Sequence, residues 1–310
     1  MDGARAEGDR IPAGLWEVLA CPQCGGGLER TAEGARCAAC GTGFGRRGDQ
    51  LDLRLARPKR VALEVELGTP LQGDPPLDFA PLPPNPRPEV DLASFAGPCH
   101  LPIDLRSWFP RAPRPGARLL DLGCGTEVHR GVALHAGWEY VGLDVAAPEA
   151  TLLGDAHALP FDDESFDAAL SIAVFEHLRV PQVAFRETFR VLRRGAPFFG
   201  TVAFLEPFHS DSHYHHSHLG VLAGLSGAGF AVERVAPTTR FWSGLDALAN
   251  MGLFPGSPRW LARALVAPVR WLHRLWWLAG RRVDANATEA NRLLKTSGAV
   301  LFLARRPSAP

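Results

Sequence analysis

The sequence predicts an α/β protein built on a doubly wound, mostly parallel sheet of seven strands. Between residues 116 and 206, short apolar runs that are typical of buried strands alternate with helical patterns, as in successive β-α-β units. The first of these runs ends in a glycine turn, a common start of a ligand-binding edge. The last two strands are expected at 230–237 and 298–306.

Length and composition indicate a globular protein with more than one folded unit. The chain has 310 residues, 46% of them hydrophobic and 21% charged, with a formal net charge of zero. This length allows one large α/β domain and a smaller unit. A net charge of zero provides no overall field that would attract nucleic acid.

The first residues, MDGARAEGDRIPAG, include acidic side chains and no apolar run. They therefore do not resemble a secretory signal or a transit peptide. We expect a cytoplasmic protein, with peripheral contact at the inner membrane surface through 258–282 as a further option.

Proline marks the joints between the predicted units. Thirteen prolines lie between Pro70 and Pro115, where each removes a backbone donor and restricts the residue before it. This stretch is either a passive spacer or an arm whose residues 100–109 fold over a ligand site. We divide the chain into a zinc-ribbon domain (1–60), a proline-rich linker or wrapping arm (61–115), the main α/β domain (116–240 and 296–306) and a helical amphipathic insertion (241–295).

Four of the six cysteines form two C-x2-C pairs near the N-terminus. Four thiolates at this spacing can close a tetrahedron around Zn²⁺, and a glycine follows each pair and permits a tight turn. Because four thiolates leave no open coordination position, we expect a structural metal. The alternative is four reduced cysteines packed as small apolar groups. The predicted zinc ligands are Cys21, Cys24, Cys37 and Cys40.

Residues 12–57 resemble the small zinc-ribbon fold of activators of tRNA and protein methyltransferases. A similar ribbon lies at the N-terminus of a bacterial ribosomal RNA guanine methyltransferase, and the resemblance is carried mainly by the cysteines. From Cys21 to Arg60, eight Arg or Lys stand against four Asp or Glu. This excess permits RNA contact without requiring it.

The segment LLDLGCGTEVHR at 119–130 is a strand followed by a G-x-G turn. A dinucleotide fold would need a third glycine where Val128 stands, and a phosphate-binding P-loop would need G-K-S/T, which is absent. Asp144 ends the next strand, where a carboxylate can accept hydrogen bonds from a ribose diol. The pattern therefore favours a nucleoside-containing ligand at the carboxyl ends of the strands.

The run 116–206 resembles class I S-adenosylmethionine-dependent methyltransferases of the type 11 group, through DLGCGTE, GDAHALPFDDESFD and EHLRVPQVAFRETFRVLRRG. The resemblance implies a Rossmann-like fold and S-adenosylmethionine as cofactor. It also implies that the glycine turn approaches the methionine part, that Asp144 holds the ribose and that Asp155 faces the adenine. The implied cofactor-binding residues are Asp121, Gly123, Cys124, Gly125, Asp144, Asp155, Ala156 and Ser171.

Glu127 departs from the family pattern, because it stands where the third glycine is usual. We expect it either to face the ammonium group of the cofactor or to cap the short helix that follows.

Methyl transfer is an in-line displacement, so the protein must align the acceptor atom and, for a hydroxyl, provide a base. The segment EPFHSDSHYHHSH at 206–218 contains five histidines. It is a polar surface loop, an acceptor pocket with a histidine base, or a second metal site. The candidates for the base are His177, His209, His215 and His216.

The predicted function is methyl transfer to a small-molecule, glycan or lipid-linked acceptor, at oxygen or nitrogen. One alternative is an RNA methyltransferase that docks RNA with its ribbon, and another is a non-catalytic cofactor-binding scaffold. Zero net charge and the lack of an N-P-P-Y motif after the fourth strand favour a small-molecule, glycan or lipid-linked acceptor over RNA.

Residues 258–282 predict a basic, Trp-rich amphipathic helix. Five arginines fall within an arc of about 60°, with leucines on the opposite side. Pro268 and the arginines argue against a transmembrane helix. The segment either packs over the sheet or at a dimer contact, or it lies on an anionic membrane and brings the site to a lipid-linked acceptor.

Overall fold

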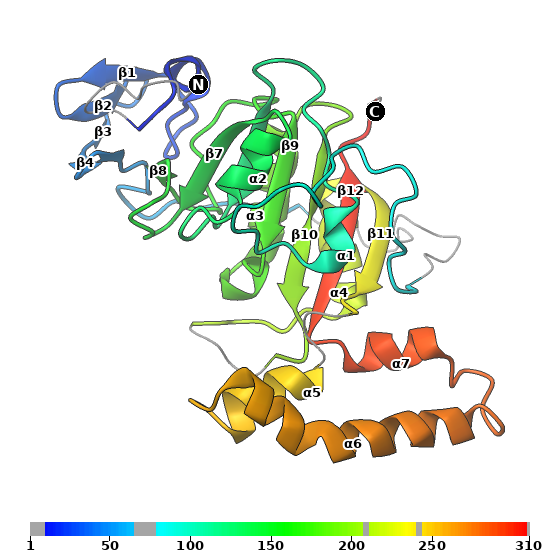
Figure 1. The fold of residues 1–310 in the computed structure, drawn as a ribbon. Helices are drawn as coiled ribbons and strands as arrows, with labels where there is room; N and C mark the ends of the chain where they lie inside the picture. Colours follow the sequence, from blue (N-terminus) through cyan, green and yellow to red (C-terminus); the bar gives the residue numbers. More distant parts are fainter. Residues whose placement is uncertain (1–9, 65–78, 207–210, 240–243, 309–310) are drawn as a thin grey trace.

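The computed structural model describes residues 10–64, 79–206, 211–239 and 244–308. A twisted central sheet carries helices on both faces, with a small cysteine-containing unit at one edge (Figure 1). A group of helices lies beyond one end of the strands (Figure 1).

The central sheet has seven strands in the order β11-β12-β10-β9-β6-β7-β8, which confirms the predicted fold class. All strands run parallel except β12, which is antiparallel to both of its neighbours. The order changes direction between β6 and β9, which makes their carboxyl ends the expected ligand edge. The strands are β6 (Arg118–Leu122), β7 (Glu139–Asp144), β8 (Leu152–Leu153), β9 (Ala168–Ile172), β10 (Pro197–Ala203), β11 (Ala231–Pro237) and β12 (Ala299–Arg305).

Local sequence signals explain the two helices on one face of the sheet. Helix α3 (Pro181–Val191) begins with proline, whose fixed φ suits a first helical turn. Helix α4 (His218–Ala228) is capped by the Ser217 hydroxyl, which accepts from the Gly220 N–H at 3.1 Å. It ends at Gly229, whose φ of 100° suits only glycine well. Both helices pack on the sheet through buried phenylalanine, valine and leucine.

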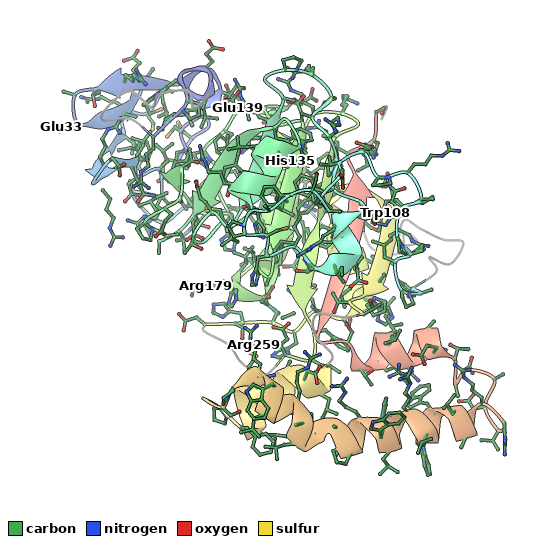
Figure 2. All side chains as sticks on the ribbon, viewed as in Figure 1. Glu33, Trp108, His135, Glu139, Arg179 and Arg259 are labelled. Atoms are coloured by element: carbon green, nitrogen blue, oxygen red, sulfur yellow. The ribbon has the colours of Figure 1, made fainter. Side chains whose placement is uncertain are left out.

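The other face is covered by the short helix α2 (Arg130–His135) and by the chain from residue 79 to 115. This part of the proline-rich arm contains α1 (Ile103–Arg106) and buries Leu105 and Phe109 in the core. Trp108, labelled in Figure 2, donates its indole N–H to the Pro83 carbonyl at 2.8 Å. The arm therefore forms a packed layer on the sheet.

The N-terminal unit begins with the 3-10 helix η1 (Ala13–Val18) and continues as short antiparallel strands. They are β1 (Leu28–Thr31), β2 (Gly34–Cys37), β3 (Gly43–Phe44), β4 (Arg46–Arg47) and β5 (Gln50–Leu51).

This unit adds to the free edge of the central sheet. The Leu53 N–H donates to the Leu153 carbonyl of β8 at 2.8 Å, and Asp52 pairs with the same residue. Leu15 and Leu19 are buried in one core with Phe161 of the main domain. The unit therefore covers an exposed strand edge and shares the core of its neighbour.

The insertion between β11 and β12 contains α5 (Gly244–Ala247), the π-helical turn η3 (Leu248–Leu253), α6 (Arg259–Gly280) and α7 (Glu289–Thr296). These helices lie beyond the carboxyl end of β10, with α6 outermost (Figure 1). Within the described residues, no helix is both long enough and apolar enough to cross a membrane.

Candidate active site

The glycine turn after β6 lies against the segment that follows β9. Gly123 has a φ of 69°, and a Cβ there would lie 2.4 Å from a methyl carbon of Val174. The Gly123 and Cys124 N–H groups donate to the Leu143 carbonyl at 2.8 and 3.2 Å. Glycine at 123 thus permits both the left-handed turn and the close approach of the neighbouring strand end.

Asp144 occupies the carboxyl end of β7 and is oriented by three backbone amides. Its Oδ2 accepts from the Gly125 N–H at 3.1 Å, and its Oδ1 accepts from Ala146 and Ala147 at 2.9 and 3.0 Å. A carboxylate offers about four acceptor positions, so Asp144 can still accept from a ligand hydroxyl.

Asp121 is buried beneath the turn. Its Oδ2 accepts from the Tyr140 hydroxyl at 2.7 Å and lies 3.1 Å from His129 Nδ1. Burial raises the pKa of Tyr140, which keeps this hydroxyl a donor. Asp121 therefore ties β6 to β7 and to the residue before α2, and it supports the turn from below.

Glu127 has a role that neither sequence expectation described. Its Oε1 accepts from the Thr151 hydroxyl at 2.9 Å, and its Oε2 lies 3.2 Å from Arg130. Glu127 adopts a φ of 52°, the region that a glycine would enter most easily. The side chain thus anchors the turn to the residue before β8.

The remaining implied cofactor residues lie at or near the same edge of the sheet. The Asp155 carboxylate contacts His157 Nδ1 at 2.6 Å and accepts its backbone N–H at 2.9 Å, and this hydrogen bonding lowers the pKa of Asp155. Burial raises the pKa of the Cys124 thiol, which therefore stays neutral. Ala156 is buried, and Ser171 is fully buried within β9.

The four N-terminal cysteines converge. Their Sγ atoms all lie within 4.8 Å of one another, with Cys21 and Cys40 3.8 Å apart and Cys24 and Cys37 3.5 Å apart. A zinc tetrahedron with Zn–S bonds of about 2.3 Å has edges of about 3.8 Å. The predicted cluster is confirmed, and its dimensions suit a four-thiolate metal site.

Two glycine turns shape this cluster. Gly25 and Gly41 have φ values of 78° and 70°. Their N–H groups donate to the carbonyls of Cys21 and Cys37 at 2.7 and 3.0 Å. Each turn brings the second cysteine of a pair back toward the first.

A cavity of about 1040 Å³ lies between the end of β10 and the helical insertion. Its apolar lining includes Phe204, Leu205, Leu245, Leu248, Trp271 and Leu293. Among the described residues, its charged lining includes Glu206, Arg270, Arg274, Glu289 and Arg292. The cavity therefore suits a largely apolar ligand that carries a polar or anionic group.

The candidate histidines occupy different places around this cavity. His215 lines it, and its Nδ1 bonds the Phe204 carbonyl at 2.7 Å. His216 is buried, its backbone N–H donates to the Ala203 carbonyl at 2.8 Å, and burial lowers the pKa of its imidazole. His177 belongs to η2 (Phe175–His177), outside the cavity lining. His209 lies outside the described residues.

Two glutamates near the strand ends were not among the predicted site residues. Burial raises the pKa of both Glu176, in η2, and Glu206, after β10, to about 7. The Glu176 backbone carbonyl accepts from the His213 and Tyr214 backbone N–H groups at 2.6 and 3.1 Å. These two hydrogen bonds hold residues 213–214 beside η2. Both residues stand in segments noted from the sequence, but nothing local distinguishes a buried carboxylate from a solvated one.

Residues 120–199 match the family described as methyltransferase domain. The chain carries a class I S-adenosylmethionine-dependent methyltransferase domain. The matched residues do not include the cysteine cluster, so the resemblance of the ribbon to methyltransferase activators stays a prediction.

Three curated relatives illustrate the range of named activities among proteins similar to this chain. A 24-methylenesterol C-methyltransferase 2 of Oryza sativa is 33% identical over 100 residues, 26% of this chain and 28% of that protein. A demethylmenaquinone methyltransferase of Roseiflexus castenholzii is 36% identical over 110 residues, 31% and 44% of the two chains. Ajmaline N-methyltransferase of Rauvolfia serpentina is 30% identical over 125 residues, 33% and 40%. The chain spans less than half the length of these relatives.

Solved structures are also similar to this chain, at low identity. A phosphoethanolamine N-methyltransferase 2 of Haemonchus contortus has 16% identity and a TM-score of 0.42, covering 66% of this chain and 52% of that one. Geranyl diphosphate C-methyltransferase of Streptomyces coelicolor has 15% identity and a TM-score of 0.40, covering 63% and 74%.

The residues of the methyltransferase domain fit S-adenosylmethionine. Among the described atoms, none lies within 4 Å of a Cβ built on Gly125, so the turn presents open backbone toward a ligand. Asp144 ends β7 and Asp155 follows β8, at the same edge of the sheet. Backbone without side chains and carboxylates at strand ends are the groups that a nucleoside-containing ligand uses in doubly wound folds.

Proposed function

We propose that this protein transfers a methyl group from S-adenosylmethionine to an oxygen or nitrogen atom of a small, largely apolar acceptor. The observation that carries the proposal is the cavity of about 1040 Å³ beside the carboxyl end of β10. β10 runs parallel to β9 and β6, so this cavity lies on the side of the sheet where the carboxyl ends of the parallel strands are. Its volume suits a ligand larger than most metabolites, because pockets for drug-sized molecules span about 300–1,000 Å³.

The names of the relatives support an apolar acceptor. They include methyltransferases of a sterol, of demethylmenaquinone and of the alkaloid ajmaline. The arginines in the cavity wall add a site for an anionic or polar group, which fits an amphiphilic or lipid-linked acceptor better than a glycan.

S-adenosylmethionine supplies an electrophilic methyl group on a positively charged sulfur. Held at the Asp144 end of β7, it would give this methyl group to a lone pair of the acceptor and leave as a neutral thioether. The acceptor loses a proton, and we assign its removal to His215. Since His215 Nδ1 donates to the Phe204 carbonyl, the basic lone pair is on Nε2. His215 is in the cavity wall, where it can meet an acceptor hydroxyl or amine.

We further propose that the four-cysteine cluster holds one structural Zn²⁺. Four thiolates at tetrahedral spacing leave no position for a substrate. The role of the metal is therefore to fix the unit that covers the β8 edge of the sheet. The position of this unit on the sheet edge, with a shared core, favours a structural role over RNA docking.

Radiolabelled S-adenosylmethionine tests the function directly. The purified protein is incubated with cell extract divided into lipid, water-soluble and RNA pools, and the label in each pool is counted. We expect label in the lipid pool, and much less of it with His215→Gln. The control is His135→Gln on α2, away from the cavity (Figure 2).

The other outcomes separate the alternatives. Label that appears in the RNA pool would favour an RNA methyltransferase. Label in no pool, together with calorimetric binding of S-adenosylmethionine, would identify a non-catalytic scaffold. Unchanged methylation by the His215 variant would remove that residue from the mechanism.

A further inference from the structure

Helix α6 presents its apolar face to solvent. Six large apolar side chains on this side are between 50% and 76% exposed. No described residue covers them, and α6 is the outermost helix of the insertion (Figure 1). These residues, here called the outer face of α6, are Trp260, Leu265, Trp271, Leu272, Leu275 and Trp276.

The arginines of the helix lie on the opposite side, toward the protein. Arg263 and Arg270 both pair with Asp246 of α5, at 3.3 and 3.1 Å. Arg281 lies 4.0 Å from Glu289 of α7. These contacts fix the rotation of α6 about its axis, so the outer face points away from α5 and α7, with Trp271 at its margin beside the cavity.

The segment around this face is strongly basic. Residues 259–295 contain eight Arg or Lys and two Asp or Glu, a net charge of +6 in a chain whose total is zero. Arg263 and Arg270 keep 51% and 44% of their side chains exposed despite their ion pairs. The exposed Trp- and Leu-rich strip thus belongs to a segment with a positive net charge.

We propose that the outer face of α6 docks on a lipid bilayer that contains anionic lipids, with the helix lying in the plane of the interface. Tryptophan prefers the boundary between headgroups and hydrocarbon, and the positive net charge of the segment attracts anionic headgroups. The charge complementarity selects the bilayer over a second copy of this chain. In a twofold dimer through this face, the two +6 segments would face each other and repel.

This docking would place the acceptor cavity at the membrane surface. Trp271 belongs both to the outer face of α6 and to the cavity lining. An amphiphile held in the leaflet that α6 contacts would therefore have a short path into the cavity. The docking itself does not depend on the proposed methyl transfer.

Vesicle flotation of the full-length protein tests the proposal. The probes are vesicles of phosphatidylcholine alone and of phosphatidylcholine with phosphatidylglycerol in equal amounts. We expect the protein to float with the anionic vesicles at low salt and to be released at high salt. The variant Trp271→Ala/Leu275→Ala/Trp276→Ala should lower the bound fraction by roughly tenfold or more. These side chains are exposed, so the variant should keep its fold, which circular dichroism checks.

A matched control changes three exposed apolar residues elsewhere, Leu134→Ala/Val180→Ala/Leu219→Ala, and should float like the wild type. Quenching of tryptophan fluorescence by brominated lipid should appear for the wild type and be lost in the α6 variant. Three results would each overturn the proposal: wild type that floats with neither vesicle, an α6 variant that floats fully, or a wild-type dimer that this variant converts to monomer. Calorimetry with S-adenosylmethionine on the same samples tests the cofactor binding that the proposed function needs. Protein that binds the cofactor but floats with neither vesicle contradicts the docking alone.

Discussion

Asp144 Oδ2 accepts a hydrogen bond from the Gly125 N–H at 3.1 Å, which joins the end of β7 to the glycine turn after β6. The same carboxylate holds the two amides that follow it in the chain. One side chain therefore sets the shape of two segments that a nucleoside ligand would contact.

The first prediction concerns this carboxylate. Asp144→Ala removes the acceptor for three amides and for the ribose hydroxyl that we propose it holds, so we expect roughly a tenfold or greater loss of S-adenosylmethionine affinity by calorimetry. Asp144→Asn keeps one oxygen acceptor and should lose less. Equal affinity for wild type and the Ala variant would place the ribose elsewhere.

The second prediction concerns the metal. Because the N-terminal unit shares a core with the sheet, chelation or Cys37→Ser should lower the thermal midpoint of the whole chain and not only melt residues 10–64. Two separate calorimetric transitions, with the second unchanged, would contradict this. A zinc content near zero in protein produced with ample zinc would refute the metal assignment.

The third prediction concerns the contact between the N-terminal unit and the loop after Asp144. The buried Gln50 amide donates to the carbonyls of Ala150 and Ala147, in the loop after Asp144. Gln50→Ala should cost about 1–3 kcal/mol of stability and weaken S-adenosylmethionine binding, while zinc content stays unchanged. If cofactor affinity matched wild type, the loop would be held adequately without the ribbon.

Local patterns in the sequence were sufficient to predict the central sheet and the cysteine cluster. Apolar runs such as 119–122 and the alternation with helices reflect burial on both faces, which is a property of neighbouring residues. The spacing of Cys21, Cys24, Cys37 and Cys40 is likewise local, and the structure brings the four together.

Contacts between distant segments could not be predicted in this way. The bond between Glu127 and Thr151 and the pairing of Asp52 with Leu153 depend on tertiary packing that leaves no local pattern. Helix α6 shows the same limit, since its periodicity gave two faces but not which one meets solvent. The ion pairs of Arg263 and Arg270 with Asp246, which lies on another helix, determine which face of α6 is exposed.

The fourth prediction addresses this aspartate, which is only 6% exposed and pairs with Arg263 and Arg270. Asp246→Ala leaves two arginines without their anion, so α6 should dock less firmly. Amide hydrogen exchange in α6 should become roughly tenfold faster or more, with β9 and β10 unchanged. Asp246→Asn keeps an oxygen acceptor and should show a smaller effect, and equal exchange in all three proteins would show that other contacts hold the helix.

The fifth prediction concerns the pH dependence of stability. Burial raises the pKa of Glu176 from 4.5 to about 7, so between these values the folded chain binds more protons than the unfolded chain. The free energy of unfolding that this group contributes is therefore fully present below pH 4.5 and is lost as pH rises through about 7. The shift corresponds to a loss on the order of 3 kcal/mol.

Glu176→Gln removes this ionisation while it keeps the size of the side chain. Denaturant unfolding should show the variant gaining stability relative to wild type as the pH rises from about 5 to about 8. Glu206→Gln should behave with the same sign, because burial also raises the pKa of Glu206 to about 7. A stability difference that does not change with pH in the Glu176 variant would show that this carboxyl titrates near its ordinary value in the folded protein. The buried glutamate would then already be ionised at neutral pH, and a neutral Glu176 would play no part in shaping the strand ends beside the cavity.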